Sequence, residues 1–303
     1  MKYTHAFAIP TRNRLVEVLD VLDSLNQMRN SCEIEVFIAE NSDSNEIFDV
    51  LKSKISGGLY GFANIQVFRS PIGSSVARNF LIDRLNVDIV TFIDDDILLP
   101  AEYAESMDKL FAENPNLVGS SPYVSSVGNL DTAKVSANGK PSKFRTPGLL
   151  NEWGINNWFD EKPVNPQLVN WLPGCAMTLR LDNLQGIRFN EDLQNGPGKG
   201  YALGEDVDFS YRLNKKGVML INSDLEITHK LSDNNRINNY RLARALGYFD
   251  AHLVKSFQLR PYKLYYINLK ILIYSLSVFS LKGVVTSSLR LFTFSKELMR
   301  DFF

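Results

Sequence analysis

The sequence is poor in cysteine, in excess charge of either sign and in long uninterrupted apolar runs. Its 303 residues include two cysteines, Cys32 and Cys175, in no CxxC or Cys/His spacing, which argues against a disulfide framework and a zinc site. A formal net charge of -1 argues against nucleic acid as the main partner. The chain also has no internal repeat and no low-complexity tract, so its composition is that of an ordinary globular protein.

The net charge of -1 hides an asymmetry along the chain. Residues 251–303 hold eight Lys or Arg against two acidic residues, which gives this segment a charge of +6 and leaves -7 for residues 1–250. Near the amino terminus, the apolar run stops at Pro10 and is shorter than the core of a signal peptide. Together with the low cysteine content, this predicts a reducing, cytoplasmic setting.

Short apolar runs that alternate with segments of helical spacing predict an α/β fold. Four runs have the character of buried strands: residues 6–9, 34–39, 65–68 and 89–93. Three of them are followed directly by polar segments: residues 10–12, 40–44 and 94–96. Because ligands of open α/β sheets bind beyond the carboxyl ends of the strands, these polar segments are predicted to line one cleft.

Three consecutive carboxylates, Asp94, Asp95 and Asp96, end the fourth predicted strand. Such a cluster is costly to hold together unless a cation or ordered hydrogen bonds neutralise it. Carboxylate oxygens are hard ligands that suit Mg²⁺ or Mn²⁺. The run therefore predicts a metal site, with a solvated acidic turn as the alternative.

A second acidic pair, Glu205 and Asp206, follows a glycine-rich loop and begins a predicted helix. Negative charge in the first turn of a helix is favoured by the helix dipole, so a capping role is one interpretation. The other is acid–base chemistry, for which a carboxylate pair at a helix start is well placed.

All three tryptophans, Trp153, Trp158 and Trp171, lie in or just after a stretch rich in Gly, Pro, Ser and Asn, residues 120–170. They either pin an irregular loop onto the core or offer flat apolar faces to an acceptor sugar ring. Both interpretations stay open.

An ordered set of motifs resembles the family 2 glycosyltransferases of the GT-A fold. The motifs are PTRNR (10–14), ENSDS (40–44), SSVARN (74–79), FIDDD (92–96), LPGCAMTLR (172–180), GEDVDFSYRL (204–213) and the later His229. The resemblance implies a Rossmann-like mixed sheet flanked by helices, with a C-terminal helical extension. Residues 1–250 would form the catalytic domain, with a nucleotide-sugar half to about 119 and an acceptor half at 120–250, and residues 251–303 the extension.

The resemblance also implies an inverting, metal-assisted transfer from a nucleotide-sugar donor. Asp94, Asp96 and His229 would hold Mn²⁺ or Mg²⁺. Alternation along an extended strand puts Asp94 and Asp96 on one side, although a turn would change the pair. Asp95 would face the ribose or support the metal ligands. Asp206 would act as general base.

The remaining implied roles concern orientation of the two substrates. Glu205 would orient the acceptor or the loop. The nucleotide would contact Pro10, Thr11, Arg12, Glu40 and Arg78. Glu40 stands where the family usually has Asp, which leaves the identity of the base open, and Arg78 has the alternative of pairing with one of the aspartates.

Two other functional classes remain beside glycosyl transfer. A nucleotidyltransferase shares the strand–helix scaffold and acidic metal site but should carry a glycine-rich phosphate loop after the first strand, and PTRNR has no glycine. A non-catalytic carbohydrate-binding protein explains the tryptophans but gives no reason for two acidic clusters.

The C-terminal segment contains two apolar stretches, residues 264–281 and 284–294, which Asn268, Lys270 and Arg290 interrupt. These interruptions make a membrane-spanning helix marginal. We expect two basic amphipathic helices, with residues 260–303 lying on an anionic membrane surface. The acceptor would then be a lipid-linked glycan at the cytoplasmic face, in cell-surface polysaccharide synthesis. Packing on the catalytic domain or across a homodimer is the alternative.

Overall fold

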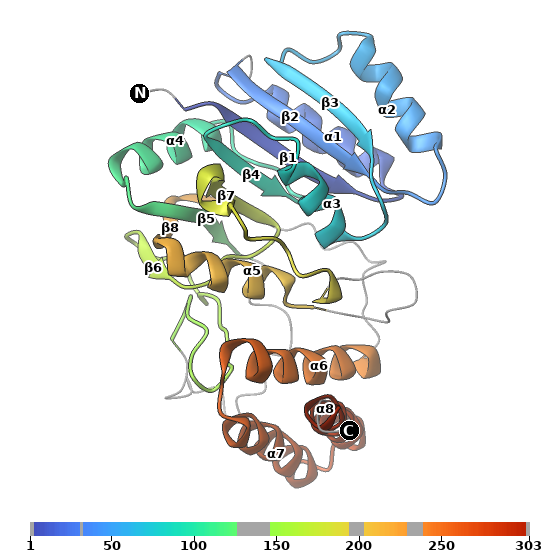
Figure 1. Cartoon of the computed structure of the whole chain (residues 1–303), viewed down its shortest axis with the longest axis vertical. Helices are drawn as coiled ribbons and strands as arrows, with labels where there is room; N and C mark the ends of the chain where they lie inside the picture. Colours follow the sequence, from blue (N-terminus) through green and yellow to red (C-terminus); the bar gives the residue numbers. More distant parts are fainter. Residues whose placement is uncertain (1–2, 31–32, 126–145, 194–202, 229–238, 301–303) are drawn as a thin grey trace. The chain divides into compact units, whose positions relative to one another are not determined.

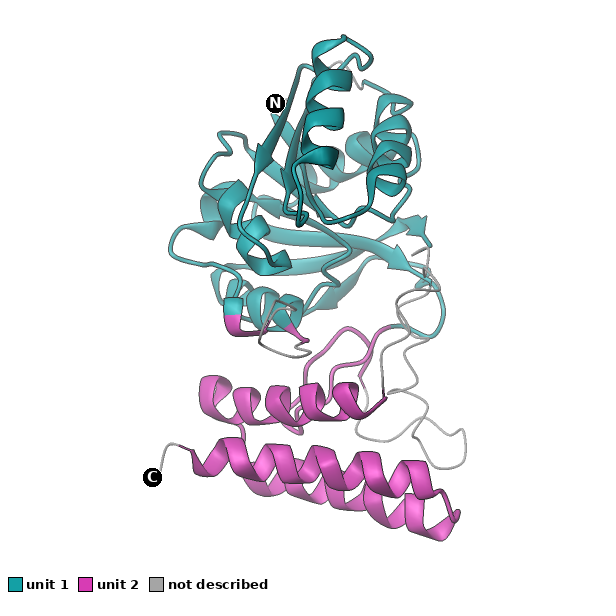
Figure 2. Ribbon diagram, turned by 90° about the vertical axis from the view of Figure 1, so that its right-hand side faces the viewer, with its two compact units in different colours: residues 1–127, 159–191, 205–231 teal, residues 128–158, 192–204, 232–303 magenta. Residues whose placement is uncertain are grey.

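The computed structural model describes residues 3–30, 33–125, 146–193, 203–228 and 239–300 (Figure 1). The chain divides into two compact units, which Figure 2 colours separately. The first unit comprises residues 1–127, 159–191 and 205–231, and the second comprises residues 128–158, 192–204 and 232–303. The expected boundary at residue 250 falls inside a helix, α6 (Asn239–Phe257), and the division into catalytic domain and extension stays a prediction.

A mixed sheet with strand order β3-β2-β1-β4-β7-β5-β8-β6 forms the centre of the first unit. Its strands are β1 (His5–Thr11), β2 (Ile34–Glu40), β3 (Asn64–Arg69), β4 (Ile89–Ile93), β5 (Leu117–Val124), β6 (Gln167–Val169), β7 (Ala176–Arg180) and β8 (Val218–Ile227). Strands β1 to β4 run parallel, and β7 is antiparallel to both β4 and β5. Strand β8 is parallel to β5 and antiparallel to β6. The predicted mixed α/β architecture is confirmed.

The register of the parallel strands brings their carboxyl ends together. Thr11, the last residue of β1, lies opposite Glu40 of β2, and Glu40 lies opposite Arg69 of β3. All residues of β1 and β4 are buried, as expected for central parallel strands whose two faces are both covered. The polar segments that follow β1, β2 and β4 therefore start from one edge of the sheet.

Helices flank the sheet of the first unit: α1 (Leu15–Asn26), α2 (Glu46–Ser56), α3 (Ser74–Ile82), α4 (Tyr103–Glu113) and α5 (Glu205–Leu213). Helix α3 packs on β1 and β2, α2 on β3, and α4 on β8. Short 3-10 turns lie at Leu181–Leu184, Glu191–Leu193 and Asn214–Lys216. The sequence did not predict α2 or β5. Strand β5 is fully buried although its centre, Gly119 to Pro122, is small and polar.

A buried polar network joins the first unit's strands to α4. His5 lies 2.8 Å from Asp108 through Nδ1 and 2.7 Å from Thr91 through Nε2. Thr91 contacts Thr178 at 2.8 Å, and the Tyr103 hydroxyl contacts Thr178 at 3.0 Å. Each buried polar group thus has a partner, and His5 has a structural role.

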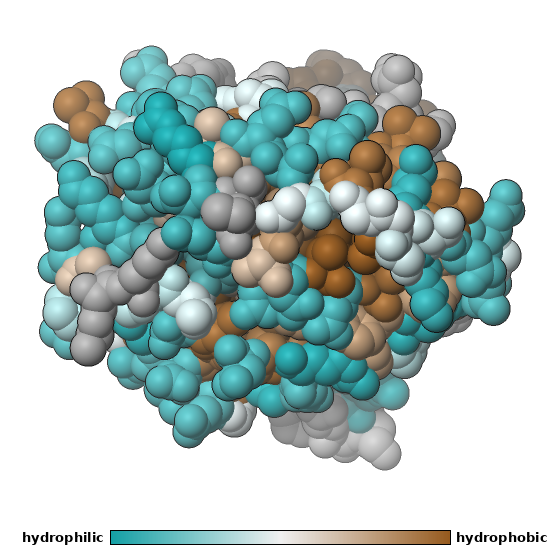
Figure 3. All heavy atoms as spheres, turned by 90° about the horizontal axis from the view of Figure 1, so that it is seen from above, coloured by the Kyte–Doolittle hydropathy of each residue, from teal (hydrophilic) through white to brown (hydrophobic). Residues whose placement is uncertain are grey.

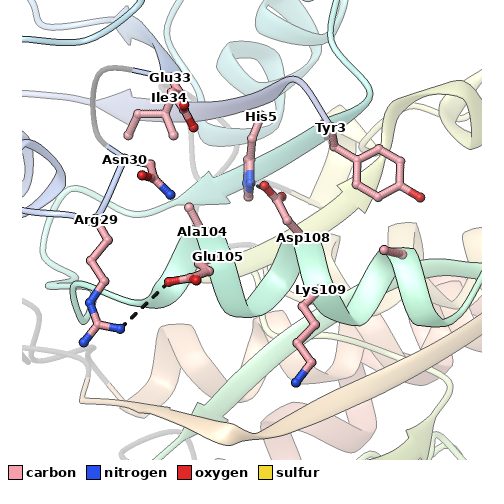
Figure 4. Close-up of a pocket in the computed structure, with 11 residues that line it drawn as sticks. Tyr3, His5, Arg29, Asn30, Glu33, Ile34, Ala104, Glu105, Asp108 and Lys109 are labelled. Carbon is pink, nitrogen blue, oxygen red and sulfur yellow. Dashed lines mark hydrogen bonds and ion pairs between the residues drawn. The ribbon is translucent and has the colours of Figure 1, made fainter. Parts of the chain in front are cut away.

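A pocket of about 280 Å³ adjoins this network (Figure 4). It includes His5 and Ile34, which are the first residues of β1 and β2, so it lies at the amino ends of the strands. Its charged lining mixes both signs, and an ion pair of 3.8 Å joins Arg29 to Glu105. This pocket is at the opposite edge from the aspartate run.

The second unit is built from α6 (Asn239–Phe257), α7 (Pro261–Ser277) and α8 (Leu281–Met299). Asp250 of α6 is buried, and Arg290 of α8 binds both its oxygens at 2.8 Å. Asn268 of α7 donates to the same carboxylate at 3.0 Å. Two of the polar residues that interrupt the apolar stretches are therefore internal partners of Asp250. At Gly247 a Cβ would come within 2.4 Å of the Arg290 carbonyl oxygen, so glycine allows α6 and α8 to meet.

Within the described part of the chain, the helices are too short or too polar to cross a membrane. The face shown in Figure 3 is mostly hydrophilic, with hydrophobic residues most numerous to the right of its centre and others elsewhere on it.

Candidate active site

The aspartate run lies in a turn directly after β4. The backbone N–H of Asp94 donates to the Cys175 carbonyl at 3.1 Å, and the chain then turns at Asp95 and Asp96. Asp94 keeps a third of its side-chain surface exposed, whereas Asp95 and Asp96 are buried. The turn breaks the strand alternation, so Asp95 and Asp96 share one partner while Asp94 has another.

Arg14, at the start of α1, is the shared partner. Its Nη1 lies 2.7 Å from Asp95 Oδ1 and 2.8 Å from Asp96 Oδ2. The Thr11 hydroxyl donates to the other oxygen of Asp95 at 2.7 Å. Burial raises the pKa of Asp95 to about 6, against the opposing effect of Thr11 and Arg14. Arg14 is not among the site residues predicted above; its signal is the second arginine in PTRNR, after a strand that neighbours the aspartate strand.

Arg78, on α3, is the partner of Asp94. Its Nη2 lies 2.7 Å from Asp94 Oδ1 and 3.3 Å from the Gly174 carbonyl, and its Nη1 lies 3.5 Å from Glu205 Oε1. The guanidinium also lies 5.4 Å from the centre of the Phe189 ring. Arg78 is buried between these groups, so the alternative interpretation of pairing with an aspartate describes its position here.

Glu205 and Asp206 begin α5 next to Arg78. Burial, followed by the charge of Asp206, raises the pKa of Glu205 to about 7. Burial also raises the pKa of Asp206, although the N–H groups of Gly174 and Val207 donate to its two oxygens at 3.0 and 2.8 Å and oppose the shift. At Gly174 a Cβ would come within 3.1 Å of Asp206 Cβ, so the small residue permits this close approach.

These contacts assemble a site with an excess of negative charge. The aspartate run and the Glu205–Asp206 pair supply five carboxyl groups, and two arginines, Arg14 and Arg78, contact four of them. Among the described residues, no group of three or more His, Cys, Asp or Glu is arranged to hold a metal ion by itself. His229 lies outside the described residues. The donor set fits a cation that takes one or two carboxylates and completes its shell with phosphate and water.

A family model described as Glycosyl transferase family 2 matches residues 6–169, more than half of the chain. The chain belongs to this glycosyltransferase family. The matched range contains the aspartate run, Arg14 and Arg78, and it ends before Glu205 and Asp206. No curated protein matches the sequence.

Solved glycosyltransferase structures share the fold at low identity. The mannosyltransferase PcManGT from Pyrobaculum calidifontis, solved with GDP-Man and Mn²⁺, has a TM-score of 0.61 and 12% identity over 99% of this chain and 88% of that one. GalNAc-T7, solved with UDP, GalNAc and Mn²⁺, has a TM-score of 0.57 and 11% identity over 86% of this chain. TarS 1-349 of S. aureus, solved with UDP-GlcNAc, has a TM-score of 0.52 and 14% identity over 83% of this chain and 66% of that one.

This glycosyltransferase spans 52% of the length of GalNAc-T7. At such identities the likeness shows the fold alone, and it confirms the predicted GT-A fold class.

The segments expected to contact the nucleotide adjoin the carboxylate site of this glycosyltransferase. Pro10 and Thr11 end β1, and Arg12 pairs with Asp43 at 2.8 Å in an exposed position. Glu40 is fully buried: the Ser42 N–H donates to Oε1 at 2.7 Å and Arg69 pairs with Oε2. Arg69, which also donates to the Ser42 carbonyl at 2.9 Å, is a further residue of this region that was not predicted.

The three tryptophans occupy different environments. Trp158 and Trp171 are buried, at 6% and 3% exposure, which favours the packing interpretation for these two. Trp153, in the second unit, lies 5.9 Å from the Tyr266 ring between centroids, with the Lys263 ammonium 5.1 Å from its ring centre. Stacking of an acceptor sugar on these rings stays a prediction.

Proposed function

We propose that this glycosyltransferase moves a sugar from a nucleoside-diphosphate sugar to a hydroxyl group of a glycan, with inversion at the anomeric carbon. The observation that carries the proposal is the convergence of two acidic groups at one site. The aspartate run comes from the β4 end and the Glu205–Asp206 pair from the α5 start, and Arg78 contacts both. One acidic group suits the leaving diphosphate with its cation, and the other suits the attacking hydroxyl.

A divalent cation, Mn²⁺ or Mg²⁺, is proposed for the aspartate run. Asp94 and Asp96, with His229 from outside the described residues, are the proposed ligands, and Asp95 would face the ribose or support them. The bound cation would supply charge stabilisation to the departing diphosphate. The excess of carboxylates over arginines supports the proposal, as do the Mn²⁺ ions in the structures of GalNAc-T7 and PcManGT.

Asp206 is the proposed general base. The acceptor hydroxyl would give its proton to the Asp206 carboxylate while its oxygen bonds to the anomeric carbon from the face opposite the diphosphate. The bond from that carbon to the diphosphate oxygen breaks, and the electron pair leaves with the nucleoside diphosphate. A raised pKa suits a base that works near neutral pH. Glu205, whose carboxylate contacts Arg78, would orient the acceptor.

The nucleotide is proposed to lie over the ends of β1 and β2. Pro10, Thr11 and Arg12 would border the base and ribose. Glu40 would act through the rigid Glu40–Arg69 pair, because both its oxygens are already engaged. Arg78 would approach the phosphates only indirectly, through Asp94. The donor's base stays open, and a panel of uridine, guanosine and thymidine diphosphate sugars is the appropriate probe.

The direct test is metal-dependent hydrolysis and transfer with such a donor panel. The parent protein should release nucleoside diphosphate only when Mn²⁺ or Mg²⁺ is present. Asp96→Ala should lose this dependence together with activity, and Asp206→Asn should bind donor yet lose transfer. Full activity of Asp206→Asn would refute the general-base assignment, and activity unaffected by chelator would refute the metal assignment.

Membrane contact through residues 260–303 is proposed as the route to a lipid-linked acceptor. Helices α7 and α8 and the turn between them expose many large apolar side chains: Tyr262, Tyr265, Tyr266, Leu269, Ile273, Leu276, Val278, Phe279, Leu281, Val285, Phe292 and Met299. Exposed lysines, Lys270, Lys282 and Lys296, accompany them. Apolar area with basic charge suits an anionic lipid surface, which favours the inner face of the cell membrane and polysaccharide synthesis there.

Vesicle sedimentation tests the membrane contact. Phe279→Ser with Leu281→Ser should lower binding to vesicles containing phosphatidylglycerol by about tenfold, because the two most exposed apolar side chains of this surface would no longer be there to insert into the lipid. Leu59→Ser, at an exposed position of the first unit, is the matched control. Unchanged vesicle binding would refute the proposal, and a dimer that dissociates in the double variant would assign the surface to a second copy of the chain.

A further inference from the structure

Arg14 places one positively charged nitrogen between two buried carboxylates. The same atom, Nη1, lies 2.7 Å from Asp95 and 2.8 Å from Asp96. The exposed fraction of both carboxyl side chains is 7% or less. A divalent cation bound through Oδ2 of Asp96, one of its proposed ligands, would need the space that this nitrogen occupies. The guanidinium and such a cation are therefore alternatives.

We propose that Arg14 is a tethered counter-ion, which neutralises Asp95 and Asp96 in the metal-free protein and leaves when the divalent cation binds. The inference rests on the proposed function, because it takes the divalent cation from there. It adds a residue that acts on metal binding without being a metal ligand. Arg14 is thus a positioning residue and not a catalytic one.

The surroundings of Arg14 permit this exchange, whereas those of Arg78 do not. Arg14 keeps 24% of its side-chain surface exposed, and its guanidinium contacts the two carboxylates. Arg78 keeps 4% and contacts Asp94, Glu205, a carbonyl oxygen and an aromatic ring. The Thr11 hydroxyl would still hold Asp95 after Arg14 leaves. Release of Arg14 thus frees the site and leaves its frame in place.

A consequence follows for the order of binding. A cation that arrives alone must displace Arg14 without new partners for the guanidinium. A cation that arrives with a nucleoside diphosphate brings phosphate oxygens, which guanidinium groups bind well. The protein should therefore bind Mn²⁺ weakly by itself and more tightly with the nucleotide.

The first experiment measures Mn²⁺ binding by electron paramagnetic resonance of the free ion, without donor and without turnover. Arg14→Gln should bind Mn²⁺ about tenfold more tightly than the parent, since a competing positive charge is gone. Arg29→Gln removes an exposed arginine at the opposite edge of the sheet and should bind as the parent does. With UDP or GDP added, the difference between Arg14→Gln and the parent should shrink. Weaker or equal Mn²⁺ binding by folded Arg14→Gln would overturn the proposal.

The second experiment uses the parent protein, so it does not depend on the folding of a variant. Phenylglyoxal modifies accessible arginines, and peptide mass spectrometry gives the rate at each one. Saturating Mn²⁺ should raise the rate at Arg14 several-fold and leave Arg29 unchanged. An unchanged or lower rate at Arg14 would overturn the proposal.

Asp96→Asn separates the two levels of inference. If the parent binds Mn²⁺, Asp96→Asn does not, and Arg14 shows neither effect, the counter-ion role fails while the metal site stands. If neither the parent nor Arg14→Gln binds Mn²⁺, even with UDP or GDP, the proposed metal site fails and the counter-ion role fails with it.

Discussion

Two buried charge clusters in this glycosyltransferase both pair carboxylates with arginines, but they differ in the ratio of carboxylates to arginines. In the second unit, one carboxylate, Asp250, receives both arms of Arg290 and the amide of Asn268. At the candidate active site, Arg14 and Arg78 pair with four carboxyl groups, and Asp206 supplies a fifth that accepts from backbone N–H groups. The first cluster is complete within the protein, and the second has carboxylates in excess.

The difference teaches how to separate structural from functional charges. In the second unit, the buried ion pair joins three helices, and hydrogen bonds within the protein satisfy its carboxylate, so it requires no ligand. In the unbalanced cluster, burial first and neighbouring carboxylates second raise the pKa of Asp95 and Glu205, and burying these groups costs stability unless a ligand completes the site. Excess charge therefore indicates the ligand site more reliably than the presence of charge.

The largest expected effect comes from Asp206→Asn. Loss of a general base should lower kcat by about 10²- to 10⁴-fold with little change in donor or Mn²⁺ binding. The matched control is Asp208→Asn on the same helix, where Asp208 pairs with Arg212 at 2.5 Å and serves the fold. Steady-state kinetics on both proteins, with circular dichroism to check folding, measures the contrast. Equal losses in the two variants would erase the distinction between a reactive and a structural carboxylate.

Arg290→Leu should cost stability and spare the chemistry. It leaves Asp250 buried without its cation, which should lower the free energy of unfolding by about 3 kcal/mol. We expect a value at the lower end of such effects because Arg290 keeps 19% of its surface exposed. Urea unfolding measures the loss, and Asp250→Leu with Arg290→Leu should recover most of it. If the double variant is no more stable than the single one, the cluster is not a simple balanced pair.

Sequence patterns predicted the elements whose signals are local. Buried runs gave β1, β2 and β4, and the rule that ligands lie beyond strand ends placed the aspartate run at the site. Partner choice was beyond the sequence, because it depends on the turn at Asp95 and Asp96, which moves them onto Arg14 and leaves Asp94 to Arg78. The role of Arg290 was equally hidden, since Asp250 lies 40 residues away.

The pH dependence of transfer tests the imbalance itself. Asp206 must be ionised to accept a proton, so kcat/KM should rise with pH through the pKa of Asp206, which burial raises above the ordinary value of an aspartic acid. Glu205→Gln removes a neighbouring negative charge, and the ionised form of Asp206 then becomes easier to reach. The acid limb should shift to lower pH by roughly one unit. A shift to higher pH, or none, would show that the two carboxyl groups do not share their charge.

The smallest effect concerns a cost that is not electrostatic. Phe279 has a left-handed backbone with φ of 52° and is 96% exposed, so it carries strain without packing in return. Phe279→Asn should raise the free energy of unfolding by about 0.5 to 1 kcal/mol, because asparagine tolerates this conformation. It should also weaken binding to vesicles that contain phosphatidylglycerol. Gln258→Asn, at a φ of 55°, is the matched control and should stabilise without changing vesicle binding. If Phe279→Asn instead destabilises the protein, the Phe279 side chain supports the fold. The backbone strain at this turn would then be compensated, unlike the excess negative charge at the active site.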